Sequence, residues 1–246
     1  VILPFVEVKG NIDKFHLSLG ELLSKGKKQA FIRYQTVIED QRGYTDENGY
    51  LGDRSKIYAR LRYNYGTRFS YGITMEKDAG EEFFKGSQKR GFDYYSGHFF
   101  IKDFGPLKAL ALGDYEIKIG QGLIMWSGFG FGKSAFVMDV KKSGPQVKPY
   151  TSVNEVKFLR GAATTLGFGN FSFTAFGSYK AIDGNQVDTD TLNNGPDAVS
   201  SFQESGFHRT EAEIEDRHAV KETVVGGSVK FSKRHFHLGA TATHVR

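Results

Sequence analysis

The residues of this sequence that could do chemistry include one glycine-rich stretch, SGFGFGKSA at 127–135. It comes close to a phosphate-binding loop, which needs Gly, four residues and then Gly-Lys-Ser or Gly-Lys-Thr. Counting back from Gly132 places Ser127 where the first glycine belongs, and neither a parallel-strand unit nor a helix pattern flanks the segment. We therefore expect a glycine-rich and aromatic loop or strand end here, without nucleotide binding.

Histidines and carboxylates are the other candidates for chemistry. His235 and His237 share one face beside a turn and could hold a transition metal weakly, but no third ligand is evident. The segment HRTEAEIEDRH, at 208–218, predicts a short helix or a solvated loop. The acidic stretch at 76–84 lacks the spacing of a calcium loop. No serine lies in a nucleophile elbow, so we predict no enzyme, no catalytic residue, no metal and no cofactor.

The elements that must carry these residues are β-strands. In KIYARLRYNYGTRFSYGITMEK, at 56–77, every second residue is large and apolar, and the residues between are mostly polar or charged. This period of two is typical of strands with two different faces. An aromatic content of 14%, with 30 glycines and only 5 prolines, favours strands joined by tight turns.

About nine segments show this pattern, most near the length of about ten residues with which a tilted strand crosses a bilayer. They lie at 29–40, 56–77 (a pair), 92–103, 107–120, 155–168, 171–181, 222–232 and 235–245. Short turns at 65–67, 104–106, 169–170 and 233–234 alternate with long polar loops at 41–55, 79–91, 127–154 and 182–221. An up-and-down meander then has all its short turns at one end, as in bacterial outer-membrane barrels.

Two turns also predict strand register. A two-residue loop at Gly169-Asn170 opposes Phe168 with Phe171, and each further pair then shares one face. The first hairpin needs a loop of odd length, and a loop at 65–67 places Lys56 opposite Glu76.

Alternation alone does not say what covers the apolar face. In a soluble sandwich two apolar faces meet, whereas in a membrane barrel the apolar face meets lipid and the polar face a lumen. Aromatic residues near strand ends, small residues in mid-strand and the unequal loops favour the barrel. The lipid-facing candidates are Ile57, Leu61, Phe69, Ile73, Phe173, Val225 and Leu238. The lumen-facing candidates are Lys56, Arg60, Arg62, Glu76, Lys108, Asp114, Glu116 and Lys118.

These faces lead to two expectations. The inward charges either pair with one another in a packed lumen or line a basic pore that attracts anions. Arginine in place of outward Leu61 should be costly, and arginine in place of inward Thr74 should be mild.

The rest of the sequence sets limits on the chain. It contains no cysteine and no run of about 20 apolar residues, so we expect no disulfide, no thiolate metal site and no transmembrane helix. It begins without Met or a signal sequence and stops within a strand pattern. We therefore expect a lead-in segment at 1–27 and part of a larger barrel at 28–246, with its first and last strands as unpaired edges.

Four stretches carry a resemblance to a known family. They are EKDAGEEFF, GFDYYSGHFFIKD, ALGDYEIKIGQGLIMWSGFGFGKSA and PYTSVNEVKFLRGAATT. The chain resembles the barrel part of Gram-negative outer-membrane proteins in which a periplasmic helix-hairpin-helix segment, akin to competence DNA-binding modules, precedes the barrel. No catalytic residues follow from this resemblance.

The resemblance supports this fold and a location in the bacterial outer membrane, and it only hints at a function. We expect an integral outer-membrane protein that acts as a channel or as an envelope-assembly or transport component. Its partners would be outer-membrane lipid and other envelope proteins, with nucleic acid bound only through a module outside this sequence. Two alternatives stay open, a DNA-binding or DNA-uptake protein of the envelope and a soluble β-rich binding domain.

Overall fold

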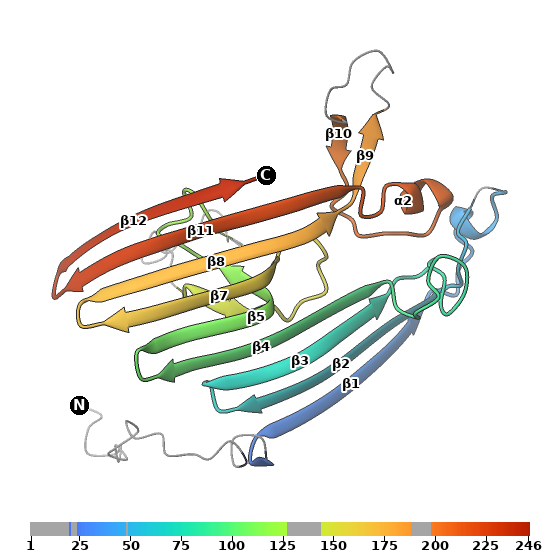
Figure 1. The fold of residues 1–246 in the computed structure, drawn as a ribbon. Coiled ribbons are helices and arrows are strands. Elements are labelled where there is room, and N and C mark those ends of the chain that lie inside the picture. Colours follow the sequence, from blue (N-terminus) through green and yellow to red (C-terminus); the bar gives the residue numbers. More distant parts are fainter. Residues whose placement is uncertain (1–19, 21–23, 48, 127–143, 188–197) are drawn as a thin grey trace, which may run out of the picture.

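The computed structural model describes residues 20, 24–47, 49–126, 144–187 and 198–246. The described chain forms one curled, ten-stranded antiparallel sheet, a separate two-stranded hairpin and very little helix (Figure 1). The sheet contains β1 (Lys27–Thr36), β2 (Ser55–Tyr65), β3 (Phe69–Lys77), β4 (Tyr94–Phe104), β5 (Leu107–Ile117), β6 (Val147–Pro149), β7 (Leu159–Phe168), β8 (Phe171–Ile182), β11 (Val220–Lys233) and β12 (Phe236–Val245). Among these residues, no helix has the length and apolar character needed to cross a membrane.

The sheet is the predicted meander. Its order is β1-β2-β3-β4-β5-β7-β8-β11-β12, with β6 pairing beside β5, and each long strand matches a predicted segment. The short hairpins lie at one end and the long connections at the other (Figure 1). Three strands were not predicted, because a strand of three to five residues is too short to show a period of two: β6, β9 (Gly184–Val187) and β10 (Ala198–Phe202). The remaining elements are η2 (Arg42–Tyr44) and the short helix α2 (Glu211–Glu215).

The edges of the sheet are β1 and β12. Each pairs with one neighbour, and within the described ranges no ladder joins them. The sheet is therefore open here, as expected for its first and last strands. That further strands complete a barrel stays a prediction.

The two predicted registers have different outcomes. Around Gly169-Asn170 the pairing is the predicted one, with Phe168 opposite Phe171, and Gly169 has the positive φ of 56° that such turns require. In the first hairpin Tyr65 pairs with Phe69, so Glu76 lies opposite Tyr58 and not opposite Lys56. The loop still has three residues, now 66–68, and a shift by two keeps every side chain on its predicted face.

A sharp bend in β5 creates the interior of the protein. The β4–β5 ladder ends at the pair His98–Gly113, and Gly113 has a φ of 86°. A Cβ atom at Gly113 would lie 2.3 Å from the carbonyl oxygen of Gly97, so only glycine fits this close approach. Beyond the bend, the hydroxyl of Tyr115 donates to the carbonyl of Gly177 in β8 at 2.7 Å, although β7 lies between the two strands in the sheet.

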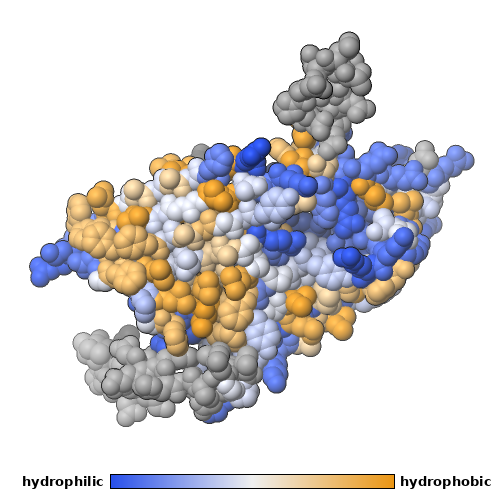
Figure 2. Space-filling model, viewed as in Figure 1, coloured by the Kyte–Doolittle hydropathy of each residue, from blue (hydrophilic) through white to orange (hydrophobic). Residues whose placement is uncertain are grey.

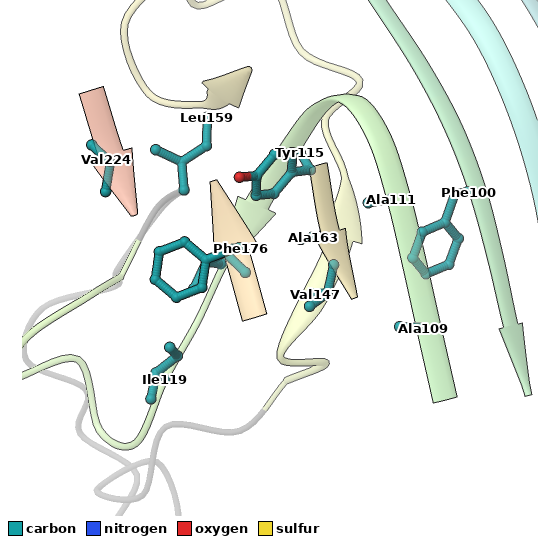
Figure 3. Packing of buried hydrophobic residues seen from close by; sticks show 11 residues of the cluster. Phe100, Ala109, Ala111, Tyr115, Ile119, Val147, Leu159, Ala163, Phe176 and Val224 are labelled. Atoms are coloured by element: carbon teal, nitrogen blue, oxygen red, sulfur yellow. The ribbon is translucent and has the colours of Figure 1, made fainter. Parts of the chain in front are cut away.

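The bend gathers an apolar cluster on one face of the sheet (Figure 3). Sheet strands contribute Phe100, Ala111, Ala163, Phe176 and Val224, and the segment after the bend covers them with Tyr115, Ile117, Ile119 and Val147. We call the face that carries this cluster the inner face and the opposite one, which carries Leu61 and Ile73, the outer face. The inner face along β5, β7 and β8 is therefore filled by the protein itself.

We predict that Gly113→Ala destabilises the fold clearly more than Gly105→Ala. Both glycines have positive φ, so alanine is strained at either place, by about 1–3 kcal/mol. Nothing lies within 4 Å of a Cβ at Gly105, whereas at Gly113 the backbone of Gly97 must also move. Urea titration of both variants measures the difference, and equal losses would show that the close approach does not matter.

Candidate functional site

The outer face of the sheet is exposed and apolar. Leu61 is 54% exposed and Ile73 is 50% exposed, and Phe173, Val225 and Leu238 are exposed as well. Ile57 is half-buried. Further exposed apolar residues continue this face across the sheet, namely Ile32, Tyr34, Tyr71, Phe99, Leu112, Tyr179 and Val229. A patch of this extent is unusual for the surface of a water-soluble monomer.

Aromatic residues concentrate on this face near the short hairpins. Phe168, Phe171 and Phe173 form one group of ring contacts that extends to Phe231 and Phe236. Figure 2 shows apolar side chains gathered at this end of the molecule, at the left of the view.

A second aromatic group explains the one outer-face candidate that is buried. Phe69, expected to face lipid, is only 5% exposed, because the rings of Tyr63, Tyr71 and Phe99 contact it.

The inner face carries polar residues that are mostly buried. Thr74 is 4% exposed and Glu76 is 3% exposed, and Ser96, Thr165 and Thr174 are also buried. Thr74 is buried and does not face an open lumen, which argues against a mild effect of arginine there, but the effect itself stays a prediction.

Several predicted inward charges pair with one another. Lys56 Nζ lies 3.1 Å from Glu76 Oε1 and also contacts Asp78. Glu116 lies 3.0 Å from Lys148 and 3.4 Å from Lys118.

Arg60 and Arg62 have amide partners instead of carboxylates. Arg60 donates to Gln29 at 3.3 Å and Arg62 to Asn64 at 3.0 Å. Within the described ranges, neither arginine forms an ion pair with a carboxylate.

Lys108 does not share the inner face as expected. Ala109 and Ala111 are buried with the inner cluster and Leu112 is exposed, so before the bend the even-numbered residues of β5 belong to the outer face. Glu116 lies beyond the bend and is buried. Lys108 lies exposed at a register shift between β5 and β7.

Asp114 lies where β4 and β5 separate, and it ties the separated strands together. It is buried and paired with Arg160 of β7 at 2.7 Å. Arg160 also donates to the carbonyl of Tyr95 in β4 at 2.9 Å, and Asp114 accepts from the amide of Gly97 at 3.2 Å.

A buried ionic network joins the loops at the long-loop end of the sheet. At its centre, His208 Nδ1 lies 2.6 Å from Asp93 Oδ2, and Nε2 lies 3.0 Å from Asp183 Oδ2. The backbone amide of His208 donates to Glu81 Oε1 at 3.1 Å. We call these residues, with Arg217, the rim network.

The aspartates of the rim network are each held by several donors. Asp93 also accepts from Gln88 and from Arg217 Nη2, the latter at 3.1 Å. Asp183 also accepts from the backbone amide of His218 at 2.8 Å. Both carboxylates are thus compensated by cationic or polar donors.

Local structure brings these residues together from distant parts of the sequence. Asp93 directly precedes β4 and Asp183 directly follows β8, so both lie at the same end of the sheet. Helix α2 separates His208 from Arg217, and Thr210 begins this helix with a capping box to Glu213. Of the two alternatives expected for 208–218, a short helix or a solvated loop, the structure shows a short helix, whereas the role of His208 was missed. Aspartates adjoining strand ends on the long-loop side were the signal in the sequence.

Burial and pairing shift the acid–base properties of the network. Burial alone would lower the pKa of His208, but hydrogen bonds to Asp183 and Asp93 outweigh it and raise the pKa to about 10. Burial and repulsion from Asp93 raise the pKa of Glu81 to about 7. Burial, with repulsion from Asp93 and Glu81, raises the pKa of Glu155 to about 9. His208 is therefore an imidazolium at neutral pH.

This protonation state argues against a metal centre. Ligand atoms of Glu81, Asp93 and His208 lie within 4.8 Å of one another, a spacing that could hold an ion. Both ring nitrogens of His208 are already bonded to carboxylates, and both oxygens of Glu81 accept backbone amides, from His208 and Asp78. The geometry fits a structural clamp that fixes the loops.

A cavity of about 690 Å³ opens beside the rim network, where β4 and β5 have separated. Its walls come from residues 86–95, 155–160, 180–183 and 217–218. Charged and aromatic side chains line it together, including Lys89, Arg90, Tyr95, Phe158 and Arg160.

Comparison with known proteins gives no match to any family model, curated protein or solved structure. The resemblance to the barrel of helix-hairpin-helix outer-membrane proteins stays a prediction. The segment Gly128–Ser134, for which no nucleotide binding was predicted, lies outside the described residues.

We predict that His208→Gln lowers the free energy of unfolding by about 3–5 kcal/mol, because it leaves two buried aspartates without their shared cation. His237→Gln is the matched control, since His237 is exposed on β12 and should change stability by less than about 0.5 kcal/mol. Urea titration at pH 7 measures both. If both variants lower the free energy of unfolding by a similarly small amount, His208 does not act as a structural clamp.

We also predict that stability falls as pH rises from about 6.5 to 10, above the range in which His218, whose pKa is lowered by burial, acts in the opposite direction. The pKa of His208 is raised above its unfolded value of about 6.5, so its contribution is complete below pH 6.5 and is lost as pH approaches 10. The raised pKa values of Glu81 and Glu155 act in the same direction from about pH 4.5, because the unfolded chain releases those protons first. Unfolding curves across this range should converge for wild type and His208→Gln at high pH, and parallel curves would refute the assignment.

Proposed function

We propose that this chain forms the wall of a bacterial outer-membrane β-barrel and serves as a plugged envelope scaffold or transport component. The observation that supports it most is the distribution of side chains. Large apolar residues such as Leu61 and Ile73 are exposed on the outer face, while Thr74, Glu76 and Ser96 are buried on the inner one. A water-soluble sheet normally shows the reverse, whereas a membrane barrel shows this arrangement.

Further features of the fold agree with a position in lipid. The long strands have about the length that crosses a bilayer at a tilt. The outer aromatic groups near the short hairpins resemble the girdles with which barrels meet the membrane interface. The proposal requires the edges β1 and β12 to be paired in the membrane, since unpaired amides have no hydrogen-bond partner in lipid.

The filled inner face favours a scaffold or gated component over a wide pore. Tyr115, Ile117 and Val147 cover the inner faces of β7 and β8, and Lys56 and Glu116 are engaged in ion pairs. Ions would therefore meet side chains where an open porin has water. We expect the protein to need detergent, to show heat-modifiable gel mobility, and to give no large steady conductance in planar bilayers.

We predict that Leu61→Arg costs about 2–4 kcal/mol when the protein is folded in lipid vesicles, because the charge would lie near the middle of the bilayer. Leu61→Phe is the control at the same site and should be nearly neutral. At an exposed position in water, arginine would change stability by only about 0.5 kcal/mol. A neutral Leu61→Arg variant, together with solubility of the protein without detergent, would refute the membrane proposal.

A further inference from the structure

The cavity beside the rim network collects positive side chains from separate parts of the chain. Lys89 and Arg90 come from the loop before β4, Arg160 from β7, Lys180 from β8 and Arg217 from the segment before β11. Lys89 and Arg90 are exposed, so they can move toward a ligand at the mouth. Such convergence is how proteins build sites for oxygen-rich anions.

The carboxylates that line the same cavity do not cancel this charge. Asp93 and Asp183 are engaged by the imidazolium of His208. Glu155, the third one, has a pKa raised to about 9 by burial and by repulsion from Asp93, so it is uncharged at neutral pH. Arg160 pairs with Asp114 and Lys180 with Glu222, which leaves the positive charge of Lys89 and Arg90 uncompensated in the described structure.

Arg217 adds a donor that lacks an acceptor. Its Nη2 atom bonds to Asp93, but its Nε atom is buried and has no hydrogen-bond partner within the described residues. A buried guanidinium N–H without an acceptor destabilises the folded protein, so a bound ligand that accepts this hydrogen bond would be favoured. Arg217 lines the cavity, so a shift of its side chain would bring this donor to an oxyanion that also bonds Lys89 and Arg90.

We propose that this cavity binds a phosphate group, carried either by a soluble phosphorylated molecule or by a lipid headgroup. Arginine forks match phosphate oxygens, and the walls formed by Tyr95 and Phe158 can hold the remainder of such a ligand. The soluble source does not depend on a membrane location, because the cavity opens at the loop end of the sheet.

The test uses the purified protein in detergent at about 0.15 M salt, which screens non-specific attraction. One arm titrates inorganic phosphate and glucose 1-phosphate by calorimetry. The other compares the thermal unfolding midpoint in micelles containing phosphatidylglycerol with that in micelles containing phosphatidylcholine alone. Saturable binding in the first arm identifies a soluble ligand, and stabilisation only by the anionic lipid identifies a headgroup.

The variant Lys89→Ala/Arg90→Ala should weaken either effect about tenfold, since both side chains are exposed and their loss leaves the rim network intact. Lys157→Ala is the matched control, an exposed lysine nearby that does not line the cavity, and it should leave binding unchanged. The proposal is overturned if neither arm shows binding, or if the double variant binds as wild type does. If the protein is soluble without detergent and still binds phosphate, the membrane proposal is refuted and the proposal of a phosphate site is supported.

Discussion

The close approach of two backbone segments at Gly113 determines most of what is unusual in this structure. Because Gly113 lies against the carbonyl of Gly97, β5 can leave β4 there while it stays paired with β7. That departure carries Tyr115 onto the inner face and gives β6 a place to pair. It also opens the gap that Arg160 bridges to β4, and beside this gap lies the cavity. The interior packing and the candidate binding site thus share one cause.

The alternation of side chains was predictable from the sequence because it depends on local geometry alone. In a strand, successive side chains point to opposite faces, so residues 56–77 show their two faces whatever surrounds them. The Gly169-Asn170 turn fixed its register for the same reason, since a two-residue loop leaves one pairing that keeps the faces aligned. The first hairpin allowed two positions for a loop of equal length, and sequence alone did not choose between them.

The candidate site was less predictable because distant residues build it. Asp93 lies at the start of the predicted strand 92–103 and Asp183 in the predicted loop 182–221, and nothing in the sequence relates them. Only the sheet places the start of β4 and the end of β8 at the same rim. The position of Asp114 depends on the bend at Gly113, beyond which β5 no longer follows its neighbour β4. The burial of Phe69 likewise depends on the aromatic rings of Tyr63 and Phe99 that contact it. In each case the deciding contacts come from other strands, which no local pattern records.

The rim network also bears on the order in which the molecule assembles. His208 bonds to Glu81 and Asp93, which are 127 and 115 residues away along the chain. These contacts form only when β3, β4, β8 and β11 already lie in one sheet, because the cost of closing such long loops must be met first. We therefore expect the network to form late in folding, after the sheet. Its charges would govern how slowly the finished rim opens, and would have little effect on how quickly the sheet forms.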